Sequence, residues 1–165
     1  MTSNDIGRRA FLGVAGAGAA SLLLFGRASG SAAAPAHFAV NHTPAEWRRT
    51  LGAQRFHILR EAGTERAFTS PLNDEHRKGI FVCAGCALPL FSSATKFESG
   101  TGWPSFWKPL PKAVVTRGDR SLLMDRTEVL CARCGGHLGH VFNDGPKPTG
   151  LRYCMNGLAL NFRAA

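Results

Sequence analysis

Two Cys-x-x-Cys pairs constrain the fold of this chain more than any other feature. The pairs are Cys83/Cys86 and Cys131/Cys134, and 44 residues separate Cys86 from Cys131. Two such pairs supply the four thiolates of a closed tetrahedral metal site. Because the gap exceeds the roughly 15–20 residues of a compact zinc ribbon, we expect the metal to clamp two distant hairpins of one domain.

Zinc is the metal that this donor set favours. Rubredoxin-like iron has the same four-sulfur geometry, and two local disulfides are a third possibility if the chain is exported to an oxidising compartment. A site closed by four sulfurs leaves no open position for a substrate. We therefore predict one structural Zn²⁺ per chain, with a role in stability and none in catalysis.

The fifth cysteine, Cys154, remains outside the two pairs. If residues 150–156 form a strand, Arg152, Cys154 and Asn156 alternate onto one face. A cationic neighbour favours the thiolate, which is the nucleophilic form of cysteine. The alternative is a small buried thiol that only packs, but packing alone does not require Arg and Asn on the same face. The pattern predicts a reactive cysteine.

A short stretch between the second cysteine pair and Cys154 contains two histidines and an acidic residue. His137 and His140 lie in a glycine-rich segment that we interpret as a turn. Such histidines could be metal ligands, core residues or proton donors, and four cysteines already satisfy a zinc ion. We predict that they donate a proton during catalysis, with Asp144 placed to orient a ring.

Residues 99–107 combine glycines with Trp103. Glycines around a tryptophan can place a large, rigid surface on an exposed loop, where it would hold a small apolar group. A core tryptophan that covers the end of a sheet explains the same composition equally well. The residues alone leave both interpretations open.

The first 34 residues are typical of an export signal. Arg8 and Arg9 form a twin-arginine pair, an apolar Gly/Ala/Leu run extends to Phe25, and small residues follow at 28–36. We expect the twin-arginine translocase to export the folded chain to the periplasm, with cleavage and no stable membrane insertion afterwards. An uncleaved amphipathic or membrane-anchoring segment is the alternative, although its glycines weaken a helix. Residues 35–42 are expected to be a linker.

The remaining residues, 43–165, are expected to form one domain, which begins with helices. Thr43 as N-cap, Pro44 and Glu46 form a helix start with a capping box. We predict a helical preface over residues 43–62, broken near Gly52 and ended by Gly63. Short apolar runs separated by turn residues then predict a mainly β fold, with antiparallel sheets in a barrel-like sandwich. These runs are residues 79–82, 88–91, 113–116, 121–125, 128–131, 150–154 and 158–162.

The formal net charge of +9 is spread along the chain. A nucleic-acid interface normally concentrates Lys and Arg in a patch or stripe. Dispersed charge is more typical of a soluble protein without a nucleic-acid partner.

In these motifs the chain resembles the methionine sulfoxide reductase B family over about residues 43–163. The matching stretches are residues 46–47, 60–66, the two cysteine pairs, 95–97, 99–106, 137–146 and 152–156. The resemblance implies a mostly antiparallel β fold, a structural zinc on the four cysteines, and an enzyme that reduces methionine-R-sulfoxide in oxidised proteins or peptides. Such an enzyme is an oxidoreductase that repairs oxidative damage.

The resemblance also implies roles for individual residues. Cys154 corresponds to the catalytic cysteine, which would attack the sulfoxide sulfur and become a sulfenic acid. Trp103 and Phe142 correspond to substrate-binding residues. The remaining active-site positions of the family correspond to His137, His140, Asp144, Arg152 and Asn156.

One departure from the family concerns how the enzyme would be recycled. Many members carry a resolving cysteine where this chain has Thr101, and no further cysteine is free once zinc is bound. The chain therefore resembles the one-cysteine members, for which we expect an external reductant, either a small thiol or a thioredoxin-like protein. The rival functions are a non-enzymatic zinc module and a thiol peroxidase.

Overall fold

The computed structural model describes residues 37–120 and 125–165, and its first element is helix α1, Pro44–Glu61. The backbone N–H of Thr43 donates to the Glu46 carboxylate at 2.8 Å, and the Thr43 hydroxyl accepts from the backbone N–H of Glu46 at 3.3 Å. These bonds form the predicted capping box. Gly52, at φ 70° and ψ 169°, divides the helix where a break was predicted. The left-handed residue that ends it is Ala62 rather than Gly63.

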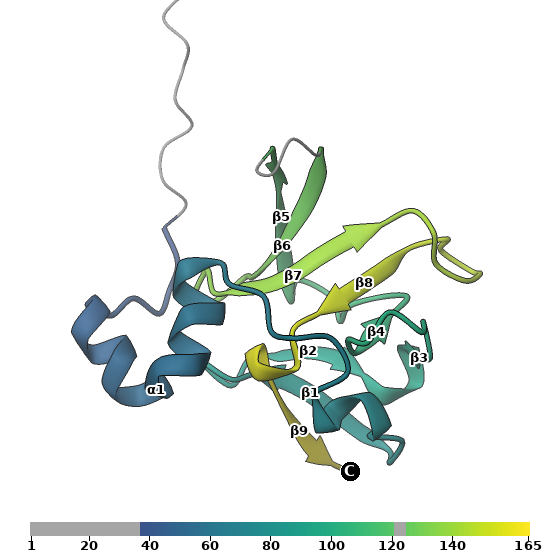
Figure 1. The fold of residues 1–165 in the computed structure, drawn as a ribbon, viewed down its shortest axis with the longest axis horizontal. Coiled ribbons are helices and arrows are strands. Elements are labelled where there is room, and N and C mark those ends of the chain that lie inside the picture. Colours follow the sequence, from purple (N-terminus) through teal and green to yellow (C-terminus); the bar gives the residue numbers. More distant parts are fainter. Residues whose placement is uncertain (1–36, 121–124) are drawn as a thin grey trace, which may run out of the picture. The chain divides into compact units, whose positions relative to one another are not determined.

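A three-stranded antiparallel sheet forms one layer of the fold. It contains strands β1 (Gly79–Cys83), β2 (Pro89–Ser92) and β9 (Leu160–Ala164), in the order β2-β1-β9. The C-terminal strand therefore lies beside β1, far from it in sequence (Figure 1). Three short 3-10 helices, Pro71–Asp74, Ser93–Thr95 and Gly157–Ala159, connect these strands to the rest of the chain.

A larger antiparallel sheet carries the remaining described strands. They are β3 (Lys96–Phe97), β4 (Ser105–Phe106), β5 (Val114–Asp119), β6 (Arg126–Cys131), β7 (His137–Phe142) and β8 (Arg152–Met155). Their order in the sheet is β3-β4-β8-β7-β6-β5 (Figure 1). The prediction of a mainly antiparallel β fold is confirmed, although the described strands form two separate sheets and no closed barrel.

The large sheet differs from the sequence-based prediction in one important strand. Residues 137–142, interpreted as a glycine-rich turn, form the central strand β7 between β6 and β8. Gly and His have little intrinsic preference for strands, so pairing on both sides decides this conformation. The two-residue strands β3 and β4 were also not predicted. Of the predicted run 121–125, residues 121–124 lie outside the described residues.

The core lies between the two sheets and is built around three fully buried phenylalanines. Phe91 of β2 stacks on Phe106 of β4 with ring centroids 4.4 Å apart, and Phe81 of β1 meets Phe106 edge-on at 4.9 Å. Such aromatic pairs add to the stabilisation from the buried apolar area. Leu138 and Met155 of the large sheet belong to the same core.

The segment before α1 contacts the domain rather than extending away from it. The backbone N–H of Val40 donates to the carbonyl oxygen of Arg133 at 3.0 Å. The ring of Phe38 lies directly over Gly135, where a Cβ atom would be 2.3 Å from a ring carbon. The predicted linker is thus attached to the second cysteine pair at these residues.

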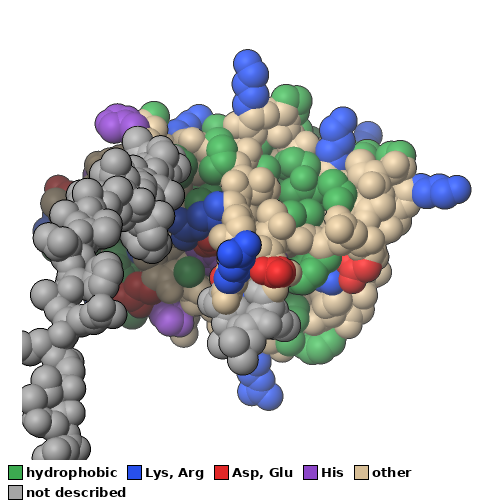
Figure 2. Space-filling model, turned by 90° about the horizontal axis from the view of Figure 1, so that it is seen from above, with side chains coloured by type: hydrophobic (Ala, Val, Ile, Leu, Met, Phe, Trp, Pro, Cys, Tyr) green, Lys and Arg blue, Asp and Glu red, His purple; other side chains and the backbone are tan. Residues whose placement is uncertain are grey.

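The expected export signal, residues 1–34, lies outside the described residues. In the part of the chain that the structure describes, no helix is long and apolar enough to cross a membrane. On the face drawn in Figure 2, Lys and Arg side chains project from several separate places, and some of them lie beside Asp or Glu side chains.

Candidate active site and metal centre

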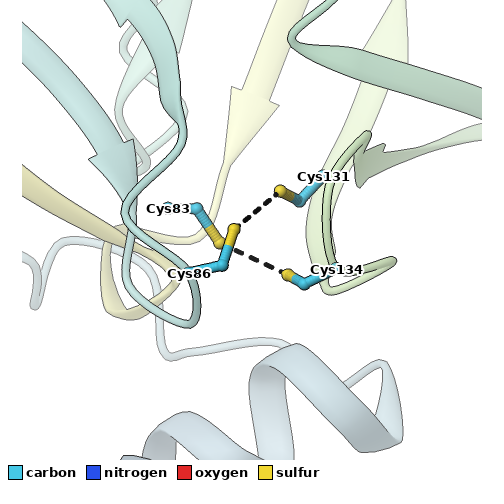
Figure 3. A group of neighbouring side chains, drawn as sticks. All are labelled: Cys83, Cys86, Cys131 and Cys134. Atoms are coloured by element: carbon cyan, nitrogen blue, oxygen red, sulfur yellow. Dashed lines mark hydrogen bonds between the residues drawn. The ribbon is translucent and has the colours of Figure 1, made fainter. Parts of the chain in front are cut away.

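The four paired cysteines come together in space. Cys83 ends β1 and Cys131 ends β6, and each is followed by a tight turn that carries the second cysteine of its pair. All four sulfurs lie within 4.8 Å of one another, with Cys83 and Cys134 at 3.7 Å and Cys86 and Cys131 at 3.5 Å (Figure 3). Tetrahedral Zn–S bonds of about 2.3 Å place ligand sulfurs about 3.8 Å apart. The cluster therefore fits a tetrahedral four-thiolate metal site.

The two turns that carry these cysteines have matching backbone structure. In the first, Ala87 has φ 59° and donates its N–H to the carbonyl of Cys83 at 2.8 Å. In the second, Gly135 has φ 66° and donates to the carbonyl of Cys131 at 2.9 Å. One turn belongs to the β1–β2 hairpin and the other to the β6–β7 hairpin. A bound metal would therefore join the two sheets, as the spacing of the pairs predicts.

Cys154 is not part of this sulfur cluster and lies on β8, in the middle of the large sheet. It pairs in register with Ser105 on one side and with His140 on the other. Its side chain is half-buried and lines a cavity of about 130 Å³. The other lining residues are Thr64, Trp103, Arg126, Gly139, His140, Phe142 and Asn156. The structure thus brings together most of the predicted site residues around the one cysteine outside the metal cluster.

A second, larger cavity of about 590 Å³ is lined by residues of α1, of the segment that contains Thr64 and Glu65, and of β9. Thr64 lines both cavities, but neither Cys154 nor a predicted histidine lines the larger one. The smaller cavity is therefore the candidate active site, because it is lined by the predicted nucleophile Cys154 and by His140, one of the two predicted proton donors.

Trp103 stands in the cavity wall on a turn that is held at several points. Its indole N–H donates to the carbonyl oxygen of Glu65 at 3.1 Å. The neighbouring Gly102 has φ 93° and accepts a hydrogen bond from the N–H of Phe68 at 2.8 Å. A Cβ atom on Gly102 would lie 2.8 Å from that same nitrogen, so only glycine fits this close approach. The geometry favours the pocket interpretation of Trp103 over the core one.

A β-bulge places both histidines in one neighbourhood. In a regular strand, residues three apart point to opposite faces. The register of β6 and β7 shifts at Leu138, where Val129 pairs with Gly139 and Leu130 pairs with His137. The rings of His137 and His140 consequently lie 5.5 Å apart between centroids. Bulges of this kind re-aim side chains beside active sites.

Each histidine contacts a carboxylate that sequence reasoning missed. Nε2 of His140 lies 2.8 Å from Oδ2 of Asp119, and Nδ1 of His137 lies 2.7 Å from Oε1 of Glu128. Because a carboxylate only accepts, these ring nitrogens are the protonated ones. Arg126 bonds Asp119 at 2.7 Å, and Arg117 bonds Glu128. In the sequence, charged residues occur at every second position in β5 (Arg117, Asp119) and in β6 (Arg126, Glu128). This alternation was the signal that could have predicted a charged sheet face next to the histidines.

Burial and hydrogen bonding have opposite effects on the pKa values of the buried pair Glu128 and His137. Burial alone would raise the pKa of Glu128, but hydrogen bonds from Arg117 and His137 outweigh it and hold that pKa below its usual value. Burial lowers the pKa of His137, against the opposite effect of Glu128. Burial thus favours the neutral form of His137, and its Nε2 is a buried atom without a hydrogen-bond partner in the described structure.

The predicted orienting role of Asp144 takes a different form in the structure. Asp144 does not contact His140; its two carboxylate oxygens accept from Nε and a terminal nitrogen of Arg152 at 2.9 and 2.8 Å. The hydrogen bonds to Asp144 raise the pKa of Arg152, and Cys154 acts in the same direction from nearby. The guanidinium also lies 4.4 Å from the ring centroid of Phe142. Asp144 therefore orients Arg152 next to the thiol.

Asn156 lines the cavity but uses its amide to hold the cavity wall. Its Oδ1 accepts from the backbone N–H of Glu65 at 3.0 Å, and its Nδ2 donates to the carbonyl of Leu138 at 3.2 Å. The Glu65 carboxylate in turn accepts from the N–H groups of Gly157 and Leu158. This buried network connects β7, the end of β8 and Glu65, whose carbonyl oxygen also holds the Trp103 indole.

The chain is similar to one known domain family and to several named proteins. Residues 51–164 match the model of the SelR domain family. A protein of Leptospira interrogans named peptide methionine sulfoxide reductase MsrB is 53% identical over 128 residues, covering 77% of this chain and 98% of its own. The same name belongs to proteins of Agrobacterium fabrum, 55% identical over 124 residues (74% of this chain and 92% of its own), and Thiobacillus denitrificans, 57% identical over 121 (73% and 92%).

The chain belongs to the methionine sulfoxide reductase B family. The expectation of an enzyme family, with an oxidoreductase activity on sulfur, is thereby confirmed. The smaller cavity, next to Cys154, is the candidate site for this activity. The roles of the individual residues in that cavity stay predictions.

Proposed function

We propose that this protein reduces methionine-R-sulfoxide in oxidised proteins, with Cys154 as the nucleophile. The observation that carries the proposal is the position of Cys154 in a cavity between Trp103 and His140, outside the sulfur cluster. The cavity of about 130 Å³ suits the end of one side chain. Trp103 would contact the methyl group and so select one epimer of the sulfoxide, since the sulfur is chiral.

The proposed chemistry transfers one oxygen atom. The Cys154 thiolate attacks the sulfoxide sulfur, and His140 protonates the sulfoxide oxygen, which is a poor leaving group as an anion. This attack forms a bond between the two sulfurs. The sulfur–oxygen bond of the substrate then breaks as the oxygen bonds to the Cys154 sulfur, and the sulfur–sulfur bond breaks at the same time, so that methionine leaves and Cys154 becomes a sulfenic acid. Two equivalents of an external thiol then restore Cys154, releasing water and a disulfide. The reductant would be a small thiol or a thioredoxin-like protein.

Neighbouring side chains support each step of this proposal. Asp119 contacts His140 and would stabilise its protonated form, so that the nitrogen away from Asp119 can donate to the substrate. Arg152, held by Asp144, places a positive charge beside the sulfur. His137 does not line the cavity and, through Glu128, would fix the position of β7 next to His140.

We further propose that the four clustered cysteines bind one structural Zn²⁺. The donor set and the sulfur spacing suit zinc, and the ion would supply cross-linking between the sheets without taking part in the reaction. Elemental analysis of the purified chain distinguishes zinc from iron. Zinc at one equivalent supports the proposal, and iron at that stoichiometry contradicts it.

Export through the twin-arginine pathway is a proposal that rests on the Arg8-Arg9 motif and the following apolar run. The enzyme would then repair oxidised proteins in the periplasm. A fusion of residues 1–34 to a folded reporter should deliver it to the periplasm, and replacing both arginines by lysine should retain it in the cytosol. Export that survives this replacement would contradict the proposal.

The central experiment measures methionine formed from a dabsylated methionine-R-sulfoxide with dithiothreitol as the reductant. The full chain should reduce the R epimer, leave the S epimer unchanged and consume no hydrogen peroxide at a comparable rate. Cys154→Ser is the matched control. Peroxide turnover without sulfoxide reduction would favour a thiol peroxidase, and inactivity towards both would favour a non-enzymatic zinc module.

A further inference from the structure

A chain of three hydroxyl groups leads from Cys154 into the protein. Oγ1 of Thr101 lies 3.7 Å from the Cys154 sulfur, and Oγ of Ser99 lies 2.9 Å from Oγ1 of Thr101. Oγ of Ser105 lies 2.7 Å from Ser99 and 3.1 Å from the carbonyl oxygen of Trp103. Ser105 is only 1% exposed and pairs with Cys154 across β4 and β8. Water is therefore excluded from the inner end of the chain.

The number of protons in this chain restricts how it can be bonded. Each hydroxyl carries one proton, whereas the Trp103 carbonyl only accepts. If Ser105 donates to that carbonyl, Ser99 must donate to Ser105 and Thr101 must donate to Ser99. The Thr101 oxygen is then left as an acceptor towards Cys154. With the hydrogen bonds in this direction, Thr101 can accept from a protonated group at Cys154, such as a thiol or a sulfenic acid.

A thiolate demands the opposite direction. It has no proton and only accepts, so Thr101 must donate to the sulfur, Ser99 to Thr101, and Ser105 to Ser99. The Trp103 carbonyl then loses its bond from Ser105. Hydrogen bonds to an ionised partner are roughly twice as strong as neutral ones, and a chain of them is cooperative. The charge on sulfur can thus determine the direction of the whole chain.

We propose that Ser105, Ser99 and Thr101 are positioning residues that stabilise the Cys154 thiolate by donating hydrogen bonds towards it. In the Cys154 sulfenic acid the direction reverses, and Thr101 accepts a hydrogen bond from the sulfenic acid hydroxyl. The proposal rests on the proposed function for the role of Cys154. It gives a role to Thr101, the residue at which the chain departs from the two-cysteine members that it resembles. It also couples the state of the sulfur to the turn that bears Trp103.

Other charged groups lie near the Cys154 sulfur and also affect the reactivity of its thiol. They are His140 on β7 with its partner Asp119 on β5, Arg126 on β6, and Arg152 on β8 with its partner Asp144. None of these groups belongs to the hydroxyl chain. Removing a hydroxyl therefore leaves every one of these charges in place.

The test follows alkylation of Cys154 by iodoacetamide in the zinc-loaded full chain from pH 5 to 10. Mass spectrometry of the peptide that contains Cys154 measures the rate at this thiol alone, and no sulfoxide is needed. Thr101→Val removes one hydroxyl at nearly constant volume, and Ser99→Ala interrupts the chain one residue further. Thr101→Ser retains the hydroxyl. Thr116→Val on the exposed part of β5 is the control with the same chemical change.

Thr101→Val should lower the alkylation rate at pH 7 about tenfold and move the midpoint of the pH profile upward, as expected for one lost bond to a charged group. Ser99→Ala should move the midpoint in the same direction by a smaller amount. Thr101→Ser and Thr116→Val should match the wild type. Thr101→Ala serves the same purpose if Thr101→Val does not fold. An unchanged profile for Thr101→Val, or for Thr101→Ala in its place, or for Ser99→Ala, would overturn the proposal. Because alkylation is independent of turnover, failure of the proposed function appears separately in the sulfoxide assay.

Discussion

Nε2 of His140 donates a hydrogen bond to the carboxylate of Asp119, 2.8 Å away on the edge strand of the large sheet. The two residues are brought together by the pairing of β5, β6 and β7, since Glu128 of β6 lies opposite His140 and Arg126 lies opposite Asp119. The contact fixes which nitrogen of the ring carries a proton and leaves the other nitrogen outside this hydrogen bond. The proposed proton donation from His140 to a substrate next to Cys154 rests on this contact.

Asp119→Asn should therefore slow sulfoxide reduction by about 10–100-fold, because the amide no longer stabilises the protonated ring. His140→Ala should cost more, within the roughly 10²–10⁴-fold range of a lost general acid. Single-turnover rates measure both, with Asp125→Asn at an exposed position as the control. If the pair acts as a unit, the double variant should be little slower than His140→Ala. Additive losses would show that Asp119 acts independently of His140.

Cys154→Ser should abolish reduction, to below about 1% of the wild-type rate, because serine is far less nucleophilic than a thiolate. The far-UV circular dichroism spectrum and the metal content should not change, since Cys154 is outside the sulfur cluster. Residual turnover above that level would exclude the assigned role of Cys154.

Cys131→Ser should release the metal and lower Tm by at least about 10 °C, because metal binding at a structural site contributes directly to folding. Cys131 connects the β6–β7 hairpin to the β1–β2 hairpin through the cluster, so its loss should weaken the contact between the sheets. Differential scanning calorimetry with elemental analysis checks this, and Cys154→Ser is the cysteine-to-serine control. A metal-free variant of unchanged stability would contradict the clamp.

Tyr153 offers a pH-dependent test of the packing beside Cys154. Burial raises its pKa above the usual value of 10.0, and its ring lies 5.9 Å from that of Phe91. Since the folded state holds this proton more tightly than the unfolded state, the associated stability is present below pH 10 and is lost as pH rises through the folded-state pKa. It is the single tyrosine of the chain. Its absorbance at 295 nm should therefore titrate above pH 10 in the native protein and near pH 10 in guanidinium.

Tyr153→Phe should remove the absorbance change and reduce the loss of unfolding free energy between pH 9 and 11. Chemical denaturation at each pH measures that free energy. A native titration midpoint at or below 10 would contradict the buried position of the hydroxyl.

The oxidised state of Cys154 after one turnover provides a further prediction. With the other cysteines in the metal cluster, Cys154 should remain a sulfenic acid that dimedone labels when no reductant is present. In Thr101→Cys, a second thiol would start near the present position of Oγ1, 3.7 Å from the Cys154 sulfur. A small movement would then allow a disulfide of about 2.05 Å. Mass spectrometry should find dimedone on the wild type and a disulfide in Thr101→Cys; a wild-type disulfide to a clustered cysteine would refute the scheme.

The sequence alone was sufficient for features that depend on local spacing. The Cys-x-x-Cys pairs, the capping box at Thr43 and the helix break at Gly52 involve residues at most a few positions apart, whose geometry is set by backbone rules. Arg152 and Cys154 likewise lie on one face of their strand because side chains two residues apart point to the same side. These features were predictable because no distant part of the chain can change them.

Only the tertiary structure determined how the active site is completed. Asp119 and His140 are 21 residues apart and meet because strand pairing aligns them; Glu65 and Asn156 are 91 apart. The bulge at Leu138 turns two histidines three residues apart towards one neighbourhood, against the regular alternation. Asp144, predicted from its distance in sequence to serve a histidine, pairs with Arg152 across the turn between β7 and β8 instead. Strand register and bulges depend on the packing of the whole sheet, and local sequence spacing does not specify them.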